Sequence, residues 1–195
     1  LLCQTYEVKA GDTILFHAAA GGVGSIACQW AKALGAKLIG TVSSAEKAAH
    51  AKALGAWETI DYSHEDVATR VRALTGGAGV DVVFDSVGKS TFIGSLDSLK
   101  RRGLMVCVGT ASGPIDGFNP QLLAMKGSLY LTRPALADYI ADPAEKTALA
   151  NELFDHVASG RIKIEINQKY ELQDAAQAHR DLESRQTTGS SVFII

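Results

Sequence analysis

Short apolar segments alternate with longer amphipathic ones from the N-terminus to Arg133. The apolar segments are rich in Val, Ile, Leu and Phe, which is typical of strands buried on both faces of a parallel sheet. They predict six strands, at 13–17, 37–42, 57–61, 80–85, 104–109 and 128–133. The intervening segments predict helices at 23–34, 44–54, 65–75, 90–100 and 119–126. This alternation predicts an α/β fold with a doubly wound, six-stranded parallel sheet.

The pattern changes after Arg133. Residues 145–160 predict an amphipathic helix that ends at a glycine, with four apolar residues on one face: Leu149, Leu153, Phe154 and Val157. Residues 161–172 alternate isoleucine with polar residues, which predicts a half-exposed strand. A helix at 173–184 and a strand at 190–195 complete this helix–strand–helix–strand tail. It has too little apolar mass for a core of its own, so we expect it to pack against another part of the protein.

Composition and charge exclude several classes of protein. The chain has 195 residues, of which 47% are hydrophobic and 21% charged, and a net charge of −2. These values are typical of a globular domain and argue against a nucleic-acid-binding surface. No apolar run reaches the roughly 18 residues needed to cross a membrane, so no membrane partner is expected.

The three cysteines, Cys3, Cys28 and Cys107, show neither a disulfide framework nor metal-ligand spacing. Cys28 and Cys107 lie in apolar segments, which predicts buried thiols. Reduced thiols favour a cytoplasmic location.

The sequence AAAGGVGS, residues 18–25, joins the first predicted strand to the first predicted helix. The start of a helix exposes unpaired N–H groups, and these bind phosphate where glycine lets the backbone come close. Gly21 and Gly24 occupy the second and third positions of the G-x-G-x-x-G motif, and Ala19 replaces the first. Alanine is compatible with that position if no positive φ is needed, and we expect Val23 to pack the turn against the sheet. The loop predicts a Rossmann dinucleotide site; the alternative is a glycine-rich turn without a ligand.

The residue expected to bind the cofactor's adenosine ribose is not acidic. NAD-binding folds place a carboxylate there, about 20 residues beyond the glycines. Here Ser43 and Ser44 end the second predicted strand, and Lys47 lies one turn into the next helix. A hydroxyl and an ammonium group would bind a 2′-phosphate that a carboxylate would repel. The pattern favours NADPH over NADH, and the missing carboxylate also argues against an S-adenosylmethionine methyltransferase.

Other residues capable of catalysis form no recognisable arrangement. His17 ends the first predicted strand, and we interpret it as a histidine hydrogen-bonded to backbone rather than a general base. Asp81 and Asp85 share one strand with no partner histidine, so no acid–base pair is predicted. The remaining histidines lack ligand spacing, and we expect no metal site.

Several segments, in this order and spacing, resemble the zinc-free, ζ-crystallin-like NADPH:quinone oxidoreductases of the medium-chain dehydrogenase/reductase superfamily. They are FHAAAGGVGSIACQWAKALGAKLIGTVSSAEK, GAWETIDY, VDVVFDSVG, RRGLMVCVG, KGSLYLTRP and AHRDLESRQTTGSSVFII. The resemblance covers essentially the whole chain and implies reduction of a small quinone by NADPH without zinc. Family members also have an N-terminal GroES-like barrel that supplies much of the substrate pocket.

The barrel would precede Leu1, so the resemblance implies that the chain is the C-terminal part of a longer protein. It implies that residues 1–160 are the NADPH-binding domain and that 161–195 belong to the catalytic domain and pack on the barrel. We therefore expect this chain alone to bind cofactor without useful turnover.

The resemblance also implies which residues contact NADPH, although it assigns no catalytic residue. The pyrophosphate would lie on Gly21, Gly22, Val23 and Gly24. The 2′-phosphate would be held by Ser43 and Lys47, with Tyr62 nearby and Arg185 closing over the cofactor. The middle and the nicotinamide end would be bordered by Ser86, Val87, Gly109, Thr110, Leu131, Thr132 and Arg133.

The sixth predicted strand is apolar and expected at the sheet edge, where uncovered strands invite pairing. Family members dimerise through this strand, so the resemblance implies a homodimer through residues 127–133. Two alternative functions remain open: a 2-enoyl or alkenal reductase of the same superfamily, and a non-catalytic, crystallin-like NADPH-binding protein.

Overall fold

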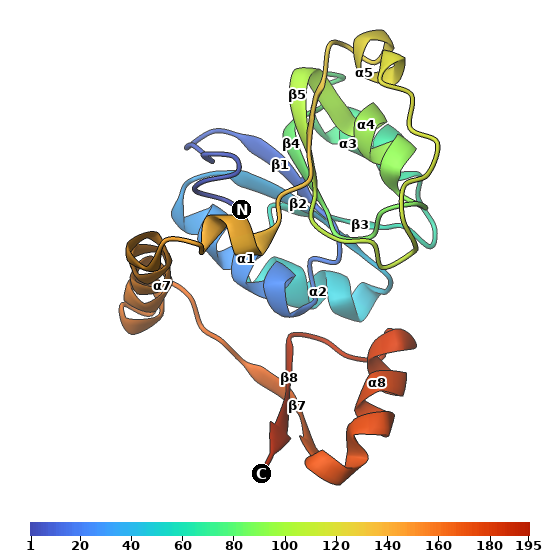
Figure 1. Cartoon of the computed structure of the whole chain (residues 1–195). Helices are drawn as coiled ribbons and strands as arrows, with labels where there is room; N and C mark the ends of the chain where they lie inside the picture. The colour runs from blue at the N-terminus through green and yellow to red at the C-terminus, as the bar shows by residue number, and fades with distance from the viewer.

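The computed structural model describes all 195 residues. Its larger part contains six strands: β1 (Thr13–Phe16), β2 (Lys37–Val42), β3 (Glu58–Asp61), β4 (Val80–Asp85), β5 (Leu99–Cys107) and β6 (Tyr130–Thr132). All neighbouring pairs are parallel, in the order β3-β2-β1-β4-β5-β6. Strands β1 to β3 are added toward one edge of the sheet and β4 to β6 toward the other, so the strand order reverses between β1 and β4. This is the topology of the Rossmann fold. The predicted doubly wound sheet is confirmed (Figure 1).

Helices cover both faces of this sheet (Figure 1): α1 (Gly22–Ala33), α2 (Ala45–Ala53), α3 (Val67–Leu74), α4 (Phe92–Ser98) and α5 (Gln121–Met125). Successive residues of a strand point to opposite faces, and the core is divided accordingly. Ile14 and Phe16 of β1 pack with α1 and α2 on one face. Leu15, between them, packs with α3 and α4 on the other.

The boundary between α4 and β5 differs from the prediction. We expected a helix to residue 100, but α4 ends at Ser98 and β5 begins at Leu99. Leu99 pairs with Val80, and the register then shifts before Leu104 pairs with Val82. Leu99 is 1% exposed, so its burial in the core favours the strand over another helical turn.

The tail begins with α6 (Leu136–Tyr139), a short helix that was not predicted, and α7 (Pro143–Ala158). On the predicted apolar face of α7, Leu149 and Leu153 are half-buried, but Phe154 is 63% exposed and Val157 36%. Contacts to the sheet domain come from the side of the helix that carries Leu149 and Leu153, where His156 packs on Trp30 at 4.8 Å between ring centres. The predicted apolar face is therefore only partly buried.

The rest of the tail consists of β7 (Ile166–Glu171), a 3₁₀ turn (Leu172–Asp174), α8 (Ala175–Glu183) and β8 (Ser190–Ile194). β7 and β8 pair in parallel as a separate two-stranded sheet, which extends away from the six-stranded sheet together with α8 (Figure 1). No residue of β7, α8 or β8 is buried. Several large apolar side chains are exposed: Ile164, Ile166, Leu172, Leu182, Phe193, Ile194 and Ile195. The tail thus has no core of its own.

All three cysteines are free, and Cys28 and Cys107 are buried as predicted. None of the helices combines the length and apolarity required to cross a membrane. No group of three or more His, Cys, Asp or Glu side chains is arranged to hold a metal ion.

Candidate functional site

The glycine turn lies at the carboxyl end of β1, next to the point where the strand order reverses. Gly21 caps α1 with extended backbone and no side-chain hydrogen bond, and the first turn contains no acidic residue. The first turn of α1 therefore supplies no carboxylate of its own to neutralise the positive end of the helix. A Cβ on Gly24 would lie 2.4 Å from the carbonyl oxygen of Ala18 and 2.6 Å from Ala19 Cα. Only glycine at position 24 lets α1 pack this closely on the turn.

The turn takes its left-handed residue at Ala18, with φ of 56°, and not at Ala19. Alanine at the first motif position is thus accommodated without a positive φ there. The expected role of Val23 was wrong, because its side chain is 65% exposed and does not pack the turn against the sheet. Val23 instead presents an apolar surface at the start of α1.

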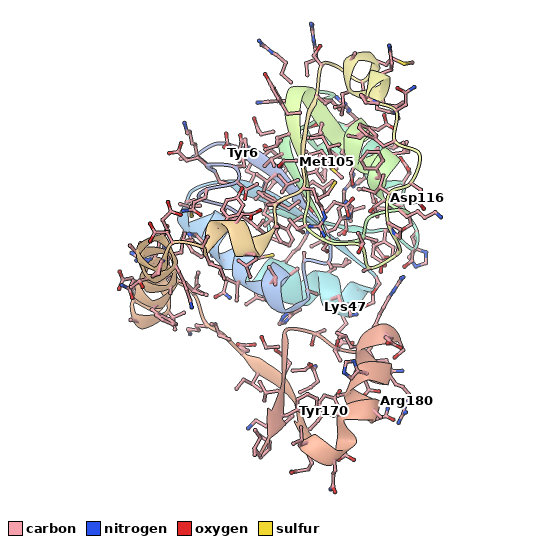
Figure 2. The ribbon with its side chains drawn as sticks, viewed as in Figure 1. Tyr6, Lys47, Met105, Asp116, Tyr170 and Arg180 are labelled. Carbon is pink, nitrogen blue, oxygen red and sulfur yellow. The ribbon has the colours of Figure 1, made fainter.

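Four residues predicted to hold the adenosine end come together from four elements. Ser43 follows β2, Lys47 lies in α2, Tyr62 follows β3, and Arg185 follows α8. Arg185 Nη1 donates to Tyr62 Oη at 3.1 Å, and its guanidinium lies 5.8 Å from the Tyr62 ring centre. The ammonium of Lys47 donates to the backbone oxygen of Arg185. Lys47 lies where α2 faces the tail (Figure 2).

The hydroxyl of Ser44 caps α2 by accepting from Lys47 N at 3.3 Å, which leaves Ser43 as the free hydroxyl of the pair. These contacts therefore bring two cations and the Tyr62 hydroxyl together. Ser43 lies beside them through its backbone oxygen, which accepts from Ser63 Oγ at 3.5 Å.

The tail also contacts the glycine turn. Gly189 N donates to the carbonyl oxygen of Ala20 at 2.8 Å, and Gly189 forms an isolated parallel bridge with Gly21. A Cβ on Gly22 would lie 3.3 Å from Gly189 O. The segment from Arg185 to Gly189 thus connects the Lys47–Tyr62 cluster to the turn.

The loops after β4 and β5 are joined through their backbones. Ser112 N donates to Val87 O at 2.8 Å, and Ala111 N donates to Ser86 O at 3.3 Å. A Cβ on Gly109 would lie 2.5 Å from Ser86 O, so glycine is required for this close approach. Four predicted site residues, Ser86, Val87, Gly109 and Thr110, therefore share one surface.

The remaining predicted residues, Leu131, Thr132 and Arg133, lie one strand further along the sheet. Thr132 pairs with Val106 of β5. Leu131 and Thr132 are half-buried, and the exposed Arg133 donates from Nη1 to Pro134 O at 3.2 Å. These three residues are connected to the loop after β5 by the pairing of β6 with β5, and not by side-chain hydrogen bonds.

Two expectations about buried polar residues were wrong. The ring of His17 bonds side chains and not backbone, with Nδ1 3.1 Å from Thr41 Oγ1 and Nε2 2.9 Å from Ser95 Oγ. Asp85 does have a histidine nearby, because its Oδ2 lies 3.8 Å from His17 Nε2. Burial lowers the pKa of His17, and the negative charge of Asp85 opposes this shift. His17, Thr41, Ser95 and Asp85 are all at most 3% exposed.

Sequence reasoning missed this network since its members come from three strands and a helix. The available signal was the position of His17, Thr41 and Asp85 at or next to the carboxyl ends of their strands.

Comparison with known proteins agrees with this fold. A family model described as zinc-binding dehydrogenase matches residues 22–157. The quinone oxidoreductase of Pseudomonas aeruginosa is 59% identical over 194 residues, which are 100% of this chain and 60% of that protein. The 2-haloacrylate reductase of a Burkholderia species is 47% identical over 195 residues, 100% of this chain and 59% of that protein.

The crystal structure of Escherichia coli quinone oxidoreductase complexed with NADPH is 56% identical with a TM-score of 0.97, covering 100% of this chain and 60% of that one. The chain spans about three fifths of the length of these relatives. It belongs to the zinc-binding dehydrogenase family.

Proposed function

We propose that this chain is the NADPH-binding part of a zinc-independent oxidoreductase that reduces quinones. The observation that carries the proposal is the cluster of Ser43, Lys47, Tyr62 and Arg185 beside a glycine turn whose helix has no acidic residue in its first turn. The names of its relatives support the reaction. The quinone oxidoreductases of Pseudomonas aeruginosa and Escherichia coli are 59% and 57% identical to it.

The residues of the turn fit a pyrophosphate. The helix terminus supplies N–H groups and partial positive charge. The absence of side chains at Gly21 and Gly22 allows close approach, and Gly24 lets α1 begin directly against the turn. In this proposal Val23 covers the pyrophosphate with its exposed side chain. Gly22 faces Gly189 of the tail, so the tail would border the same group.

The adenosine 2′-phosphate would be held by Ser43, Lys47 and Arg185. Lys47 and Arg185 carry positive charge, and charged hydrogen bonds to phosphate are about twice as strong as neutral ones. The guanidinium of Arg185 is oriented by Tyr62, which reduces the side-chain entropy lost on binding. NADH lacks the 2′-phosphate and would gain nothing from these groups.

The remainder of the cofactor would lie along the carboxyl edge of β4, β5 and β6. Ser86 and Val87 would border its middle, and Gly109 and Thr110 would lie near the nicotinamide. Leu131, Thr132 and Arg133 would form the far wall at that end. Bound NADPH supplies the hydride chemistry, and these residues position it and exclude water.

We also propose that residues 1–160 form the cofactor-binding domain and that 161–195 complete a second domain. The exposed apolar side chains of the tail support this division, because isolated chains rarely expose so many in one region. A GroES-like barrel preceding residue 1 in the longer protein would cover them.

Two further features belong to this proposal. β6 lies at the sheet edge, and Tyr130 on it is 61% exposed, which supports a homodimer through 127–133. The free thiols support a cytoplasmic location.

A second candidate acceptor is an activated alkene. The 2-haloacrylate reductase relative is 47% identical to this chain over its full length. An enone or haloacrylate would require the same cofactor site, and the acceptor would be selected outside the residues of this chain.

Thermal unfolding with NADPH, NADH or no ligand tests the cofactor assignment. A ligand at 100 times its Kd stabilises the native state by about 2.7 kcal/mol, which raises the Tm by about 5–11 °C for a chain of this size. We expect that shift with NADPH and a much smaller one with NADH. Equal shifts would contradict the role of Lys47 and Arg185, and no shift with either would contradict cofactor binding by the chain alone.

A further inference from the structure

The buried polar side chains beneath the candidate site form one continuous hydrogen-bonded chain. At one end, Ala18 N donates to Thr41 Oγ1 at 3.3 Å. At the other, the carboxylate of Asp85 accepts from Val87 N at 2.8 Å and from Gly88 N at 2.9 Å. The His17 ring stands between these ends, bonded to Thr41 and to Ser95.

The direction of each hydrogen bond follows from the donors at the two ends. Ala18 N–H can only donate, so it occupies one of the two acceptor positions on Thr41 Oγ1, and the hydroxyl hydrogen of Thr41 remains available for His17 Nδ1. The carboxylate of Asp85 receives four donors, including Thr91 Oγ1 and Ser95 Oγ at 2.7 Å each from Oδ2. This suits the ionised, acceptor-only form.

Because Ser95 donates its one hydrogen to Asp85, it must accept from His17 Nε2. In a neutral ring the proton on Nε2 leaves Nδ1 unprotonated, and Nδ1 then accepts from Thr41 Oγ1.

This chain of hydrogen bonds connects the loops that surround the candidate site. Ala18 is the left-handed residue of the glycine turn, and its carbonyl oxygen accepts from Gly21 N at 3.0 Å. Thr41 O also accepts from Ala19 N at 3.1 Å. Asp85 holds the loop after β4 through its side chain, and its backbone oxygen accepts from Val108 N at 2.7 Å, next to the loop after β5.

We propose that His17 is a positioning residue that, as the neutral Nε2–H tautomer, fixes the glycine turn and the loop after β4 relative to each other. The inference rests on the proposed NADPH site, since these two loops would hold its pyrophosphate and its middle. The ring of His17 would touch neither the pyrophosphate nor the middle of the cofactor. It acts through Thr41 on one side and through Ser95 and Asp85 on the other.

The tautomer is tested first, on the unmodified chain, by long-range ¹H–¹⁵N correlation NMR of the histidine rings at pH 7.5. We expect Nε2 of His17 to be the protonated nitrogen, Nδ1 the unprotonated one, and the Nε2 proton to exchange slowly with water. A proton on Nδ1, or a rapidly averaging pair, would overturn the proposal. This result does not depend on cofactor binding, so it stands apart from the failure of the proposed function.

The linkage is tested by a double-mutant cycle on Kd for NADPH, with Thr41→Val and Ser95→Ala. Each single change should weaken binding about tenfold, the effect of losing one buried hydrogen bond. Thr41 and Ser95 are linked through His17, so either single change already breaks the hydrogen-bonded chain. The double variant should therefore lose about tenfold in total relative to the wild-type chain, and not a hundredfold. A multiplicative loss, or no loss in the singles, would overturn the linkage.

Ser98→Ala is the matched control. Its hydroxyl is buried in the same helix as Ser95 and donates to Gly94 O at 2.8 Å, so it is not part of the hydrogen-bonded chain. It should keep the wild-type Kd, and a loss equal to that of Ser95→Ala would assign the effect to α4 and overturn the proposal.

Amide hydrogen exchange, measured without cofactor, tests the linkage between the two loops even if NADPH does not bind to the chain. Ser95→Ala should speed exchange at Val87 and Gly88, and also at Ala18 on the far side of His17. Exchange faster at Val87 and Gly88 alone would show that the two loops are held independently and overturn the proposal.

Discussion

The methyl group of Ala19 fills the space that Gly40 leaves on the neighbouring strand. A Cβ on Gly40 would lie 2.4 Å from Ala19 Cβ, far inside contact distance. Gly40 is on β2 and pairs with Phe16 of β1, just before the turn. The first position of the dinucleotide motif can therefore be alanine here because its neighbour across the strands is glycine.

This relationship predicts a compensating pair of substitutions. Gly40→Ala should destabilise the chain by about 1–3 kcal/mol, because an added methyl group in a packed site forces the backbone to shift. Adding Ala19→Gly should recover most of that loss by removing the opposing methyl group. Urea unfolding of the two single variants and the double variant measures this. Losses that simply add would show that the two side chains do not share one space.

Gly24→Ala should damage the turn more than any other glycine substitution in α1. The new Cβ would meet backbone atoms of Ala18 and Ala19 at 2.4–2.6 Å, and neither can move without displacing the turn. We expect a loss of several kcal/mol or failure to fold. Gly94→Ala in α4 is the control, because a Cβ there has no neighbour within 4 Å. It should stabilise the helix by about 0.5–1 kcal/mol, and equal effects of the two changes would contradict the packing argument.

The sheet was predictable because its strands are short apolar runs with buried faces. The glycine turn was predictable from its place between β1 and α1. The positions of Ser43 after β2 and of Lys47 in α2 were predictable from counting along the chain, and their role toward the cofactor stays a prediction. The pairing of Gly40 with Ala19, and the network around His17, depend on atoms that β1, β2, β4 and α4 bring together. No local pattern encodes such contacts.

The tail is a second case in which the sequence pattern did not predict the contacts. The alternation in 161–172 predicted a strand with one buried face, but β7 begins only at Ile166, and Ile164 and Ile166 are 48% and 52% exposed. Ile162 alone is buried, at 1% exposed. An alternating pattern indicates which side chains prefer burial, and the surface that covers them lies elsewhere in the fold or outside the chain.

Lys47→Ala should weaken the binding of NADPH by about 10-fold or more, as expected for the loss of a charged hydrogen bond to phosphate. The Kd for NADH should stay unchanged, because NADH has no 2′-phosphate. Isothermal titration calorimetry at low ionic strength measures both constants. Lys52→Ala is the control, since Lys52 lies on the same helix but pairs with Glu58 at 2.9 Å. If both lysine variants lose NADPH affinity equally, the effect is one of general charge and not of this site.

The three thiols should resist alkylation in the native state. Burial is the main cause that raises the pKa of Cys3 and Cys107 to about 11 and that of Cys28 to about 12. Only about one thiol in a thousand with a pKa near 11 is ionised at pH 8, and the thiolate is the reactive form. Iodoacetamide at pH 8, followed by mass spectrometry, should label the chain slowly in buffer and fully in urea. Rapid labelling of Cys28 or Cys107 in buffer would contradict their burial.

We predict that the native state of the chain loses stability on mild acidification because of His17. Burial lowers its pKa in the native state below the ordinary 6.5, the value expected in the unfolded chain. As the pH falls below about 6.5, the unfolded state binds a proton that the native state does not, so the free energy of unfolding decreases, by at most about 1.4 kcal/mol per pH unit. Above that pH both states carry neutral His17, and its contribution is constant.

His17→Asn removes this titrating group while Asn can still accept from Thr41. Urea unfolding between pH 5 and 7.5 should therefore give a shallower pH dependence for His17→Asn than for the wild-type chain. The variant should be less stable at pH 7.5, because its link to Ser95 is lost, and the difference should narrow toward pH 5. Parallel curves for His17→Asn and the wild-type chain would show that His17 binds protons equally in both states, which its burial beside Ser95 and Thr41 does not allow.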